Sequence, residues 1–543
     1  MGKKPTIAVF CSCFSFLISC NYQIDYLPIE PPGSIKKNTE LDKEALKVWQ
    51  YKDVVIDTVP GISLNRAYNT ILKKKTGKEV IIAIIDSEID IQHKDLQQSI
   101  WKNQDEIPKN GLDDDNNGYV DDVYGWNFLG NDKGENSNFT SYEYVRIIKE
   151  FNKKSKNSSL LDSTIFRSYD KALLKYNAQM KFAQKDIDYA NMLLRSMANV
   201  KNKLSIYFKD DSYTIHHLDS LKEVYPKDKN LQRYILIRSN FIKYGYSQEF
   251  MNTYKLKATE RVNKLLNLEY NDRIIVGDNP SDLSDVNYGN NVVNGNVDLF
   301  THGTEVSSLI ANMGSKYIKI MSIPISPFGD EHDKDISLAI KYAVDNGAKV
   351  INMSFSKGFS IHKSWVDEAF KYAEKHNVLI VSSAGNSKYN LNKKYNYYPT
   401  DETNDNIEIS DNFILVGGTT RHLNENIFYE YSNYGSKDID VFAPGENIYV
   451  MLPKNDYKYN SGTSLSSSIV SGVAGLLYSY YPSLNVSEIK NIIMESGLKY
   501  YFNVKTPTQE DKSKTTPFNQ LSKSGKVVNA YNAFVMAEER VNK

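Results

Sequence analysis

The run YNSGTSLSSSIVSGVAGLLYSYYP, which contains Ser464, carries a glycine-bearing turn that leads directly into an apolar-periodic helix. A serine at a helix start has two interpretations. It can be an N-cap, which satisfies unpaired backbone N–H groups. It can also be a nucleophile, because those N–H groups and the positive end of the helix dipole suit a developing oxyanion. Caps are far commoner than nucleophiles, so this stretch alone favours the cap.

A nucleophilic serine needs a general base, and the base needs a carboxylate that holds its tautomer. His302 is distinctive among the eight histidines, because FTHGTEVSSLIANM places it beside a tight turn that opens a helix with one buried face. Asp86 ends the β-branched run VIIAIID, which predicts a strand buried on both faces. Asp86, His302 and Ser464 therefore have the residue types of a catalytic triad.

Helices and strands alternate along the chain around these residues. AKVINMSF, NVLIVSSAGN and NFILVGGTT predict strands, and residues 335–346 and 364–376 predict amphipathic helices. Such alternation indicates an α/β fold with a mostly parallel sheet. In open α/β sheets, functional sites lie at the carboxyl ends of the strands, so we expect all three residues to meet at that edge.

Between Asp86 and His302, the stretch from Gly134 to Pro226 contains no glycine or proline in its interior. It is rich in Lys, Leu, Ala, Met and Tyr, which favour a long helix. Partner helices are expected in NLQRYILIRSNFIKYG and FMNTYKLKATERVNKLLNLEY. We therefore predict an all-α, antiparallel, coiled-coil-like and self-contained insertion at residues 140–270, which could cap a cleft or dock a protein partner. Its apolar seam steps alternately by three and four through Leu173, Tyr176, Met180, Ala183, Ile187, Ala190, Leu194 and Met197.

Four motifs resemble those of the subtilisin-like serine proteases and stand in that family's order. VIIAIIDSEIDIQHKDL is similar to the aspartate motif, THGTEVSSLIA to the histidine motif, VSSAGN to the oxyanion motif and SGTSLSSSIVSGVAGLL to the serine motif. The similarity covers residues 78–128 and 299–543. It implies the family's three-layer α/β fold and a serine endopeptidase that hydrolyses proteins or peptides through an acyl-enzyme.

The resemblance also assigns roles to individual residues. It implies that Asp86, His302 and Ser464 form the triad and that the side-chain amide of Asn386 stabilises the oxyanion. INMSFS looks like the strand that pairs with the substrate backbone, and VSSAGN lies on the other side of the pocket. The residues expected to contact substrate are therefore Ser354, Phe355, Ser356, Ser382 and Ser383.

The chain departs from the family pattern at several positions. Glu305 replaces a second histidine, Ser468 replaces a proline, and Ser466 and Ser467 replace alanines. None belongs to the triad, so we expect the nucleophile to be retained. The alternative function is a catalytically silent scaffold that binds partners through the insertion. A serine esterase of the α/β-hydrolase kind is disfavoured, because GxSxG is absent and that fold runs serine, acid, histidine.

An acidic loop, EIPKNGLDDDNNGYVDDVYGWNF, follows the Asp86 motif. It matches a calcium-loop pattern with Gly118 at the sharp turn, and Tyr119 stands where a backbone carbonyl serves. Tyr124 occupies the position of the closing glutamate, so Asp122 or outside ligands would complete the site. The alternative is an acidic turn without metal. The loop predicts a structural calcium ion, with no catalytic cofactor, held by Asp113, Asp115, Asn117, Tyr119 and Asp121.

The first twenty residues carry Lys3 and Lys4 and then IAVFCSCFSFLIS, which has the length of a signal-peptide core and is too short to span a membrane. The run closes on LISC, which resembles the lipobox of bacterial lipoproteins, with Cys20 as the lipidated residue. The alternative is a plain secretory signal. We expect an exported lipoprotein, anchored in the bacterial cell envelope on its periplasmic or cell-surface face.

Composition adds few constraints. Lys plus Arg and Asp plus Glu both number 66, so no basic field indicates nucleic-acid binding. All three cysteines lie within the first twenty residues, which excludes disulfides and thiolate metal sites after Cys20. The expected divisions are a signal peptide, an N-terminal tether and lead-in segment, a first catalytic segment, the helical insertion and a second catalytic segment, at 1–20, 21–77, 78–139, 140–270 and 271–543.

Overall fold

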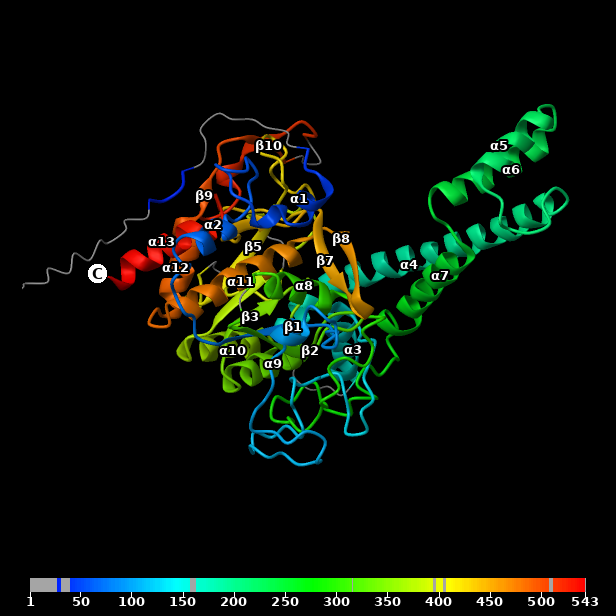
Figure 1. The fold of residues 1–543 in the computed structure, drawn as a ribbon. Helices are drawn as coiled ribbons and strands as arrows, with labels where there is room; N and C mark the ends of the chain where they lie inside the picture. Colours follow the sequence, from blue (N-terminus) through cyan, green and yellow to red (C-terminus); the bar gives the residue numbers. More distant parts are fainter. Residues whose placement is uncertain are drawn as a thin grey trace, which may run out of the picture.

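The computed structural model describes residues 27–30, 40–156, 163–314, 316–393, 397–403, 407–506 and 511–542. An eight-stranded sheet in the order β2-β1-β3-β4-β5-β6-β12-β9 forms its centre (Figure 1). Only the β12–β9 pair is antiparallel among these strands. In sheet order the strands are Ile318–Pro324, Val80–Asp86, Ala348–Met353, Leu379–Ser383, Phe413–Thr419, Val441–Pro444, Lys526–Val527 and Leu498–Lys499.

Strand β1 brings Asp86 to the carboxyl edge of this sheet. It pairs in parallel with β2 and β3, and Asp86 lies opposite Pro324 while Ile85 lies opposite Met353. Both faces of β1 are covered, which agrees with its unbroken β-branched run. The predicted strands and their common edge are confirmed.

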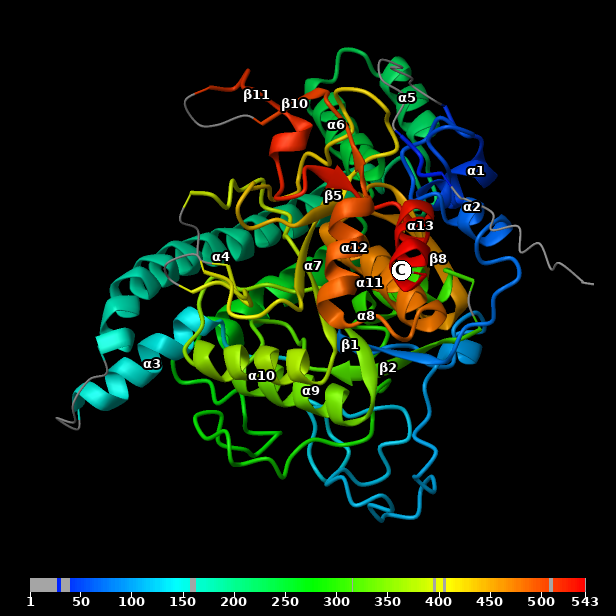
Figure 2. The same cartoon turned by 90° about the vertical axis from the view of Figure 1, so that its left-hand side faces the viewer.

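Helices cover both faces of the sheet and give the three-layer α/β fold that the sequence predicted (Figure 2). Helices α8, His302–Ala311, and α11, Thr463–Tyr480, pack on one face, with α12, Val486–Ser496, and α13, Ala530–Val541, outside them. Helices α9, Asp333–Asp345, and α10, Lys363–Lys375, cover the other face.

Helix α11 lies very close to the sheet. Only Ser464 and Tyr480 of its residues escape full burial. A Cβ added to Gly475 would lie 2.6 Å from Ile82 Cδ1, so glycine is what permits this approach. The position of the helix that carries Ser464 is therefore fixed against β1, which carries Asp86.

Smaller elements complete this region of the molecule. Strands β7 and β8 form one antiparallel hairpin and β10 and β11 another. Their bounds are Ile448–Leu452, Asp456–Asn460, Asn503–Lys505 and Thr515–Pro517. The short helices are α1 Lys43–Lys47, η1 Trp49–Tyr51, α2 Leu64–Asn69, η2 Gln97–Ser99, η4 Pro453–Asn455 and η5 Phe518–Gln520.

The segment before β1 is packed and is not a free tether over its described residues. Trp49, Val54, Val59 and Ile62 have no exposed surface and belong to the same hydrophobic core as the central sheet. The predicted boundary at residue 77 therefore divides one packed unit. The segment was predicted to be a tether because it is polar and contains several prolines, and its apolar residues are too scattered to form a periodic pattern.

Residues between β1 and α8 include a set of helices that extend from the sheet. Figure 1 shows α4 running outward, with α7 beside it and α5 and α6 at the tip. Ala183, Ala190 and Met197 of the predicted seam are buried in α4. The helices are α3 Glu143–Lys156, α4 Ser163–Leu204, α5 Ile215–Val224, α6 Lys229–Lys243, α7 Gln248–Glu260 and the π-helical turn η3 Arg261–Leu265.

The base of these helices is not self-contained. Tyr144 and Ile148 of α3 share a hydrophobic cluster with Phe359 and Ile361, which follow β3. In the outer region, separate small hydrophobic clusters fill the space between α4, α5, α6 and α7.

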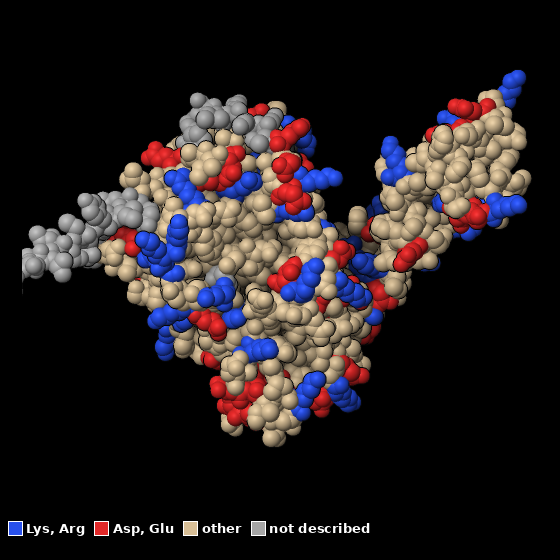
Figure 3. Space-filling model, in the orientation of Figure 1, with Lys and Arg blue, Asp and Glu red and all other residues tan. Residues whose placement is uncertain are grey.

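Charges of both signs are interspersed over the face of the molecule drawn in Figure 3. No helix among the described residues is both long and apolar enough to cross a membrane. Cys20, the predicted lipidation site, lies outside the described residues.

Candidate active site

Asp86 and His302 form a hydrogen-bonded pair at the carboxyl edge of the sheet. His302 Nδ1 donates to Asp86 Oδ1 over 2.7 Å, and the Ser87 N–H donates to the same oxygen. The Asp86 side chain is buried, whereas that of His302 is 41% exposed. This arrangement leaves the other ring nitrogen of His302 for a second partner on the open side.

The pair adjusts the basicity of His302. Burial lowers the pKa of His302, but the charge of Asp86 and its hydrogen bond outweigh burial and raise the pKa above its usual value. Glu305 raises the pKa further, and Lys458 lowers it. His302 is thus a stronger base than a free histidine.

Ser464 is the second residue of α11, and Gly462 is the N-cap with no side-chain cap bond. The cap interpretation of Ser464 is therefore wrong. Its hydroxyl donates to the backbone carbonyl oxygen of Ser354 at 3.2 Å. Because a hydroxyl has one hydrogen, this bond must break before Ser464 can donate to His302. The Ser464 N–H lies in the first turn, where N–H groups have no partner within the helix.

The Ser464 carbonyl oxygen accepts hydrogen bonds from three hydroxyl groups. Ser354 donates at 3.2 Å, and Ser467 and Ser468 each donate at 2.9 Å. The serines that replace the family's alanine and proline thus hold the first turn of α11 in place. Ser466 instead donates to the carbonyl oxygens of Ala443 and Pro444.

Asn386 lies beside this helix start. Its Oδ1 accepts the Thr463 N–H at 3.0 Å, and the Gly385 N–H donates to Thr463 Oγ1 at 3.0 Å. These two bonds orient the Asn386 amide, so that its Nδ2 is the group left to face a ligand. Nδ2 would lie 3.4 Å from a Cβ added to Gly462, which places it next to the Ser464 turn.

Asn433, which sequence reasoning missed, holds the Asn386 loop from behind. It is buried, its Nδ2 donates to the Ala384 carbonyl, and its Oδ1 accepts the N–H groups of Ser387 and Tyr389. No sequence signal marks this role, because Asn433 lies in a separate loop after β5.

Glu305, which stands outside the triad, has its own place in the site. It is buried one turn after His302, where it accepts hydrogen bonds from Thr301 and Asn460 and pairs with Lys458 Nζ at 2.7 Å. Glu305 thus connects the helix of His302 to β8, the strand that leads into the Ser464 turn.

The predicted substrate residues divide into two groups. Ser354 is buried with its hydroxyl committed to α11, Phe355 is half-buried, and Ser356 is exposed beside Asn386's loop. Ser382 and Ser383 are buried within β4, so their side chains are not accessible to a peptide. That prediction is wrong for these two side chains, because both faces of β4 are covered.

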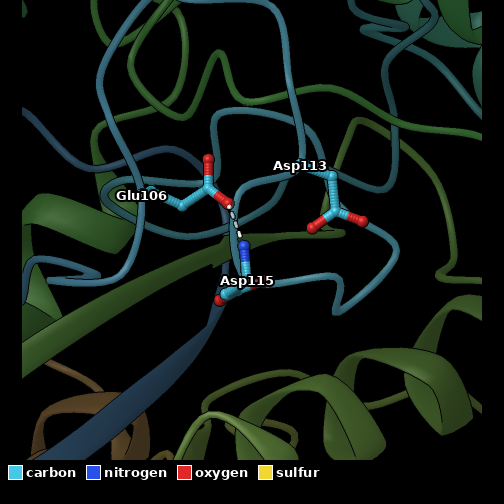
Figure 4. A group of neighbouring side chains, drawn as sticks. All are labelled: Glu106, Asp113 and Asp115. Carbon is cyan, nitrogen blue, oxygen red and sulfur yellow. Dashed lines mark hydrogen bonds between the residues drawn. The ribbon is translucent and has the colours of Figure 1, made fainter.

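The acidic loop brings together some of the predicted calcium ligands. Carboxylate oxygens of Glu106, Asp113 and Asp115 lie within 4.8 Å of one another (Figure 4). Asp121 is not part of this group, and its carboxylate accepts the N–H groups of Asn110 and Gly111.

The remaining predicted ligands have other partners. The Asn117 amide donates to Asp115 and Asp122. The ring centroids of Tyr119 and Tyr342 lie 4.7 Å apart. This contact does not involve the Tyr119 backbone carbonyl oxygen, which is the predicted ligand atom. Glu106 was missed because it precedes the loop pattern.

Comparison with known proteins decides the family. The sequence model of the subtilase family matches residues 77–520. The chain belongs to the subtilase family. The subtilase signature thus spans the aspartate, histidine and serine motifs together with the helices between them.

Relatives of this subtilase are found among named proteases. It is 32% identical over 208 residues to the cell wall-associated protease of Bacillus subtilis (strain 168), covering 36% of this chain and 21% of that protein. It is 30% identical over 207 residues to Subtilisin DY of Bacillus licheniformis, covering 36% and 70%. The matched part of this chain covers only 21% of the Bacillus subtilis protease. It covers 34% of another relative, Subtilisin-like protease 1 of Plasmodium falciparum (isolate 3D7).

Solved structures of subtilases are also similar. That of subtilase cytotoxin SubAB assembly is 26% identical, with 45% of this chain and 79% of that chain covered and a TM-score of 0.35. That of a cold adapted subtilisin-like serine proteinase is 23% identical, with 40% and 73% covered and a TM-score of 0.32.

Proposed function

We propose that this subtilase is a serine endopeptidase that hydrolyses peptide bonds in proteins or peptides. The observation that carries the proposal is the Asp86–His302 hydrogen bond at the sheet edge where α11 presents Ser464. The Asn386 amide beside the same helix start supports it. Named proteases among the relatives support the substrate class.

In the proposed mechanism His302 takes the proton of Ser464 while Asp86 holds the imidazole and stabilises the imidazolium. Ser464 Oγ attacks the scissile carbonyl carbon and forms a tetrahedral oxyanion. Asn386 Nδ2 and the Ser464 N–H donate to this oxyanion, and such a side-chain donor contributes about 2.7 to 4 kcal/mol. His302 then protonates the leaving amine, and water hydrolyses the acyl-enzyme.

Replacing the nucleophile tests the proposal. Ser464→Ala is expected to lower kcat by about six orders of magnitude and to abolish labelling by a fluorophosphonate. Ser461→Ala is the matched control, because Ser461 lies in the same turn but its hydroxyl accepts the Asn447 N–H. Absence of labelling and casein hydrolysis in the wild type would favour the scaffold function instead.

We also propose that Glu106, Asp113 and Asp115 hold a structural calcium ion. Glu106 Oε2 is buried without a hydrogen-bond partner among the described residues, and a cation would satisfy it. Burial raises the pKa of Glu106, and the charges of Asp122 and Asp115 raise it further, as expected for an acidic group that lacks a counter-charge. Oxygen ligands of this kind suit calcium, which would hold the loop together and take no role in the chemistry.

Calcium removal should therefore destabilise the protein. Chelation is expected to lower the wild-type unfolding temperature, because an ion bound only to the folded state stabilises that state. The Asp113→Asn, Asp115→Asn double variant should show no such change. An unchanged wild-type temperature would mean that the loop is only an acidic turn.

We further propose export and lipid anchoring through Cys20, supported by Lys3, Lys4 and the apolar run that ends in LISC. A lipidated N-terminus would place the enzyme at a bacterial membrane surface in the cell envelope. Cys20→Ser is expected to move the protein from the membrane to the soluble fraction. Continued retention in the membrane fraction would exclude this anchor.

A further inference from the structure

A cavity of about 340 Å³ opens beside Asn386. The catalytic domain supplies one wall through Ser356 and Gly358, which follow β3, and through the loop at Gly385 and Asn386. Because the cavity adjoins both the proposed oxyanion amide and the proposed peptide-binding segment, a substrate side chain next to the scissile bond would enter it.

The helices between β1 and α8 supply the opposite wall. Its residues come from the residue before α3 and the start of α3, from α4 and from η3, and they are Tyr142, Tyr144, Lys175, Gln179 and Arg261. Tyr142 and Tyr144 stack with ring centroids 5.2 Å apart, and Arg261 donates to Gln179. The cluster that contains Tyr144 also contains Phe359 of the catalytic domain. This wall is therefore packed against the cleft and is not a loose flap.

The charges that line the cavity differ in how well they are paired. Lys357 Nζ lies 2.7 Å from Asp333, and Arg261 lies 3.8 Å from Asp186. Asp330, the acidic lining residue, accepts the Glu143 N–H at 2.8 Å. Burial raises the pKa of Asp330 above its usual value, and the charges of Arg146 and Lys357 offset only part of this effect.

Lys175 differs from these residues. It is exposed on α4, lines the cavity and forms no ion pair within the stretches of chain that the structure describes. A flexible ammonium on a long stem can move to meet a ligand carboxylate. The exposed charge of the cavity that has no ion pair among the described residues is therefore the positive charge of Lys175. The tyrosine rings offer apolar surface to the stem of a substrate side chain.

We propose that the inserted helices form a specificity wall of the substrate cleft and that Lys175 makes the cavity prefer peptides with an acidic side chain over those with a basic one. This inference rests on the proposed endopeptidase function. It gives the base of the insertion a role in substrate selection that is separate from any role of its tip.

The test uses the full-length protein and short peptides that differ only at the residue before the scissile bond, with Glu or Lys there. Wild type is expected to cleave the Glu peptide with the higher kcat/KM. Lys175→Glu reverses the charge and should lower the Glu-to-Lys ratio of kcat/KM by about tenfold at low salt, and high salt should reduce this change. Lys175→Met should give an intermediate ratio.

Lys185→Glu is the matched control. Lys185 is an exposed lysine of the same helix that does not line the cavity, so the ratio should stay within about twofold of the wild-type value. Equal ratios in the wild type and Lys175→Glu, with Ser464 still labelled by a fluorophosphonate, would overturn this inference alone. Absence of labelling and cleavage in the wild type would overturn the endopeptidase function and this inference with it.

Discussion

At the scale of single residues, the protonation of His302 sets the pH at which the proposed chemistry operates. Only neutral imidazole can accept the Ser464 proton, so activity should rise as the pH increases through the His302 pKa. Burial lowers that pKa, but Asp86 and then Glu305 raise it, while Lys458 lowers it. Glu305 and Lys458 form an ion pair with each other yet act on His302 in opposite directions.

Because Glu305 and Lys458 act on the His302 pKa in opposite directions, replacing each of them should shift the pH profile in opposite directions. Glu305→Gln removes a negative charge near His302, so the acid limb of the kcat/KM profile should move to lower pH by about half a unit. Lys458→Met removes a positive charge, and the same limb should move to higher pH. Both variants break the same ion pair, so a purely structural effect would move both limbs in one direction. Profiles of kcat/KM against pH measure the shifts, and shifts of equal sign would contradict an electrostatic role.

The sequence could place those candidate site residues whose positions depend on local structure. Asp86 ends a recognisable strand, and His302 and Ser464 open recognisable helices, so each could be placed from its own segment. Glu305 and Asn433 contact partners in other segments, and no local pattern reports such contacts. Glu106 lies in the acidic loop itself but precedes the calcium-loop pattern. Ser382 and Ser383 were misplaced because a motif match does not show which side chains of a strand are covered.

At the scale of elements, buried ion pairs join α3 to the catalytic domain. The Arg146 guanidinium pairs with Glu143 and donates to the backbone carbonyl oxygens of Ser141, Asp330 and Glu331. Lys357, just after the peptide-binding segment, also lies 3.4 Å from Glu143. Buried charges of this kind are costly when one partner is lost, because the other charge stays buried without compensation.

Arg146→Met is therefore expected to lower the free energy of unfolding by about 3 kcal/mol or more. The substitution removes one donor from Glu143 and one from each of three backbone carbonyl groups. Lys153→Met is the matched control on the exposed side of α3 and should change the free energy by about 0.5 kcal/mol or less. Urea unfolding measures both. Equal stabilities of the two variants would show that this junction does not hold α3 in place.

Element prediction succeeded where apolar residues are dense and periodic, as in β1 and α11. It failed in residues 41–62, because Trp49, Val54, Val59 and Ile62 are scattered among polar and turn-forming residues. These side chains are buried by strands and helices far along the chain, and a local pattern cannot reveal such partners.

At the scale of the whole molecule, the helices between β1 and α8 have a base and a tip that belong to different cores. The base shares a cluster with the catalytic domain and lines the cavity. The tip has its own clusters around Leu218 and around Phe241, and the central core contains none of their buried residues. The base of the inserted helices therefore packs against the region of the proposed active site, whereas the tip has no core in common with it.

Removing the tip should then leave hydrolysis of short peptides intact. Tyr254 of α7 donates to Asp186 of α4, so these helices can be joined close to this point by replacing residues 188–253 with a short glycine-rich turn. Because the deleted residues lie far from the cavity wall, kcat/KM for short peptides should stay within about twofold of the full-length value. The same truncation with Ser464→Ala supplies the background rate. A large loss of short-peptide hydrolysis with retained folding would show that the tip supports the cleft, whereas a loss confined to folded protein substrates would assign the tip to substrate docking.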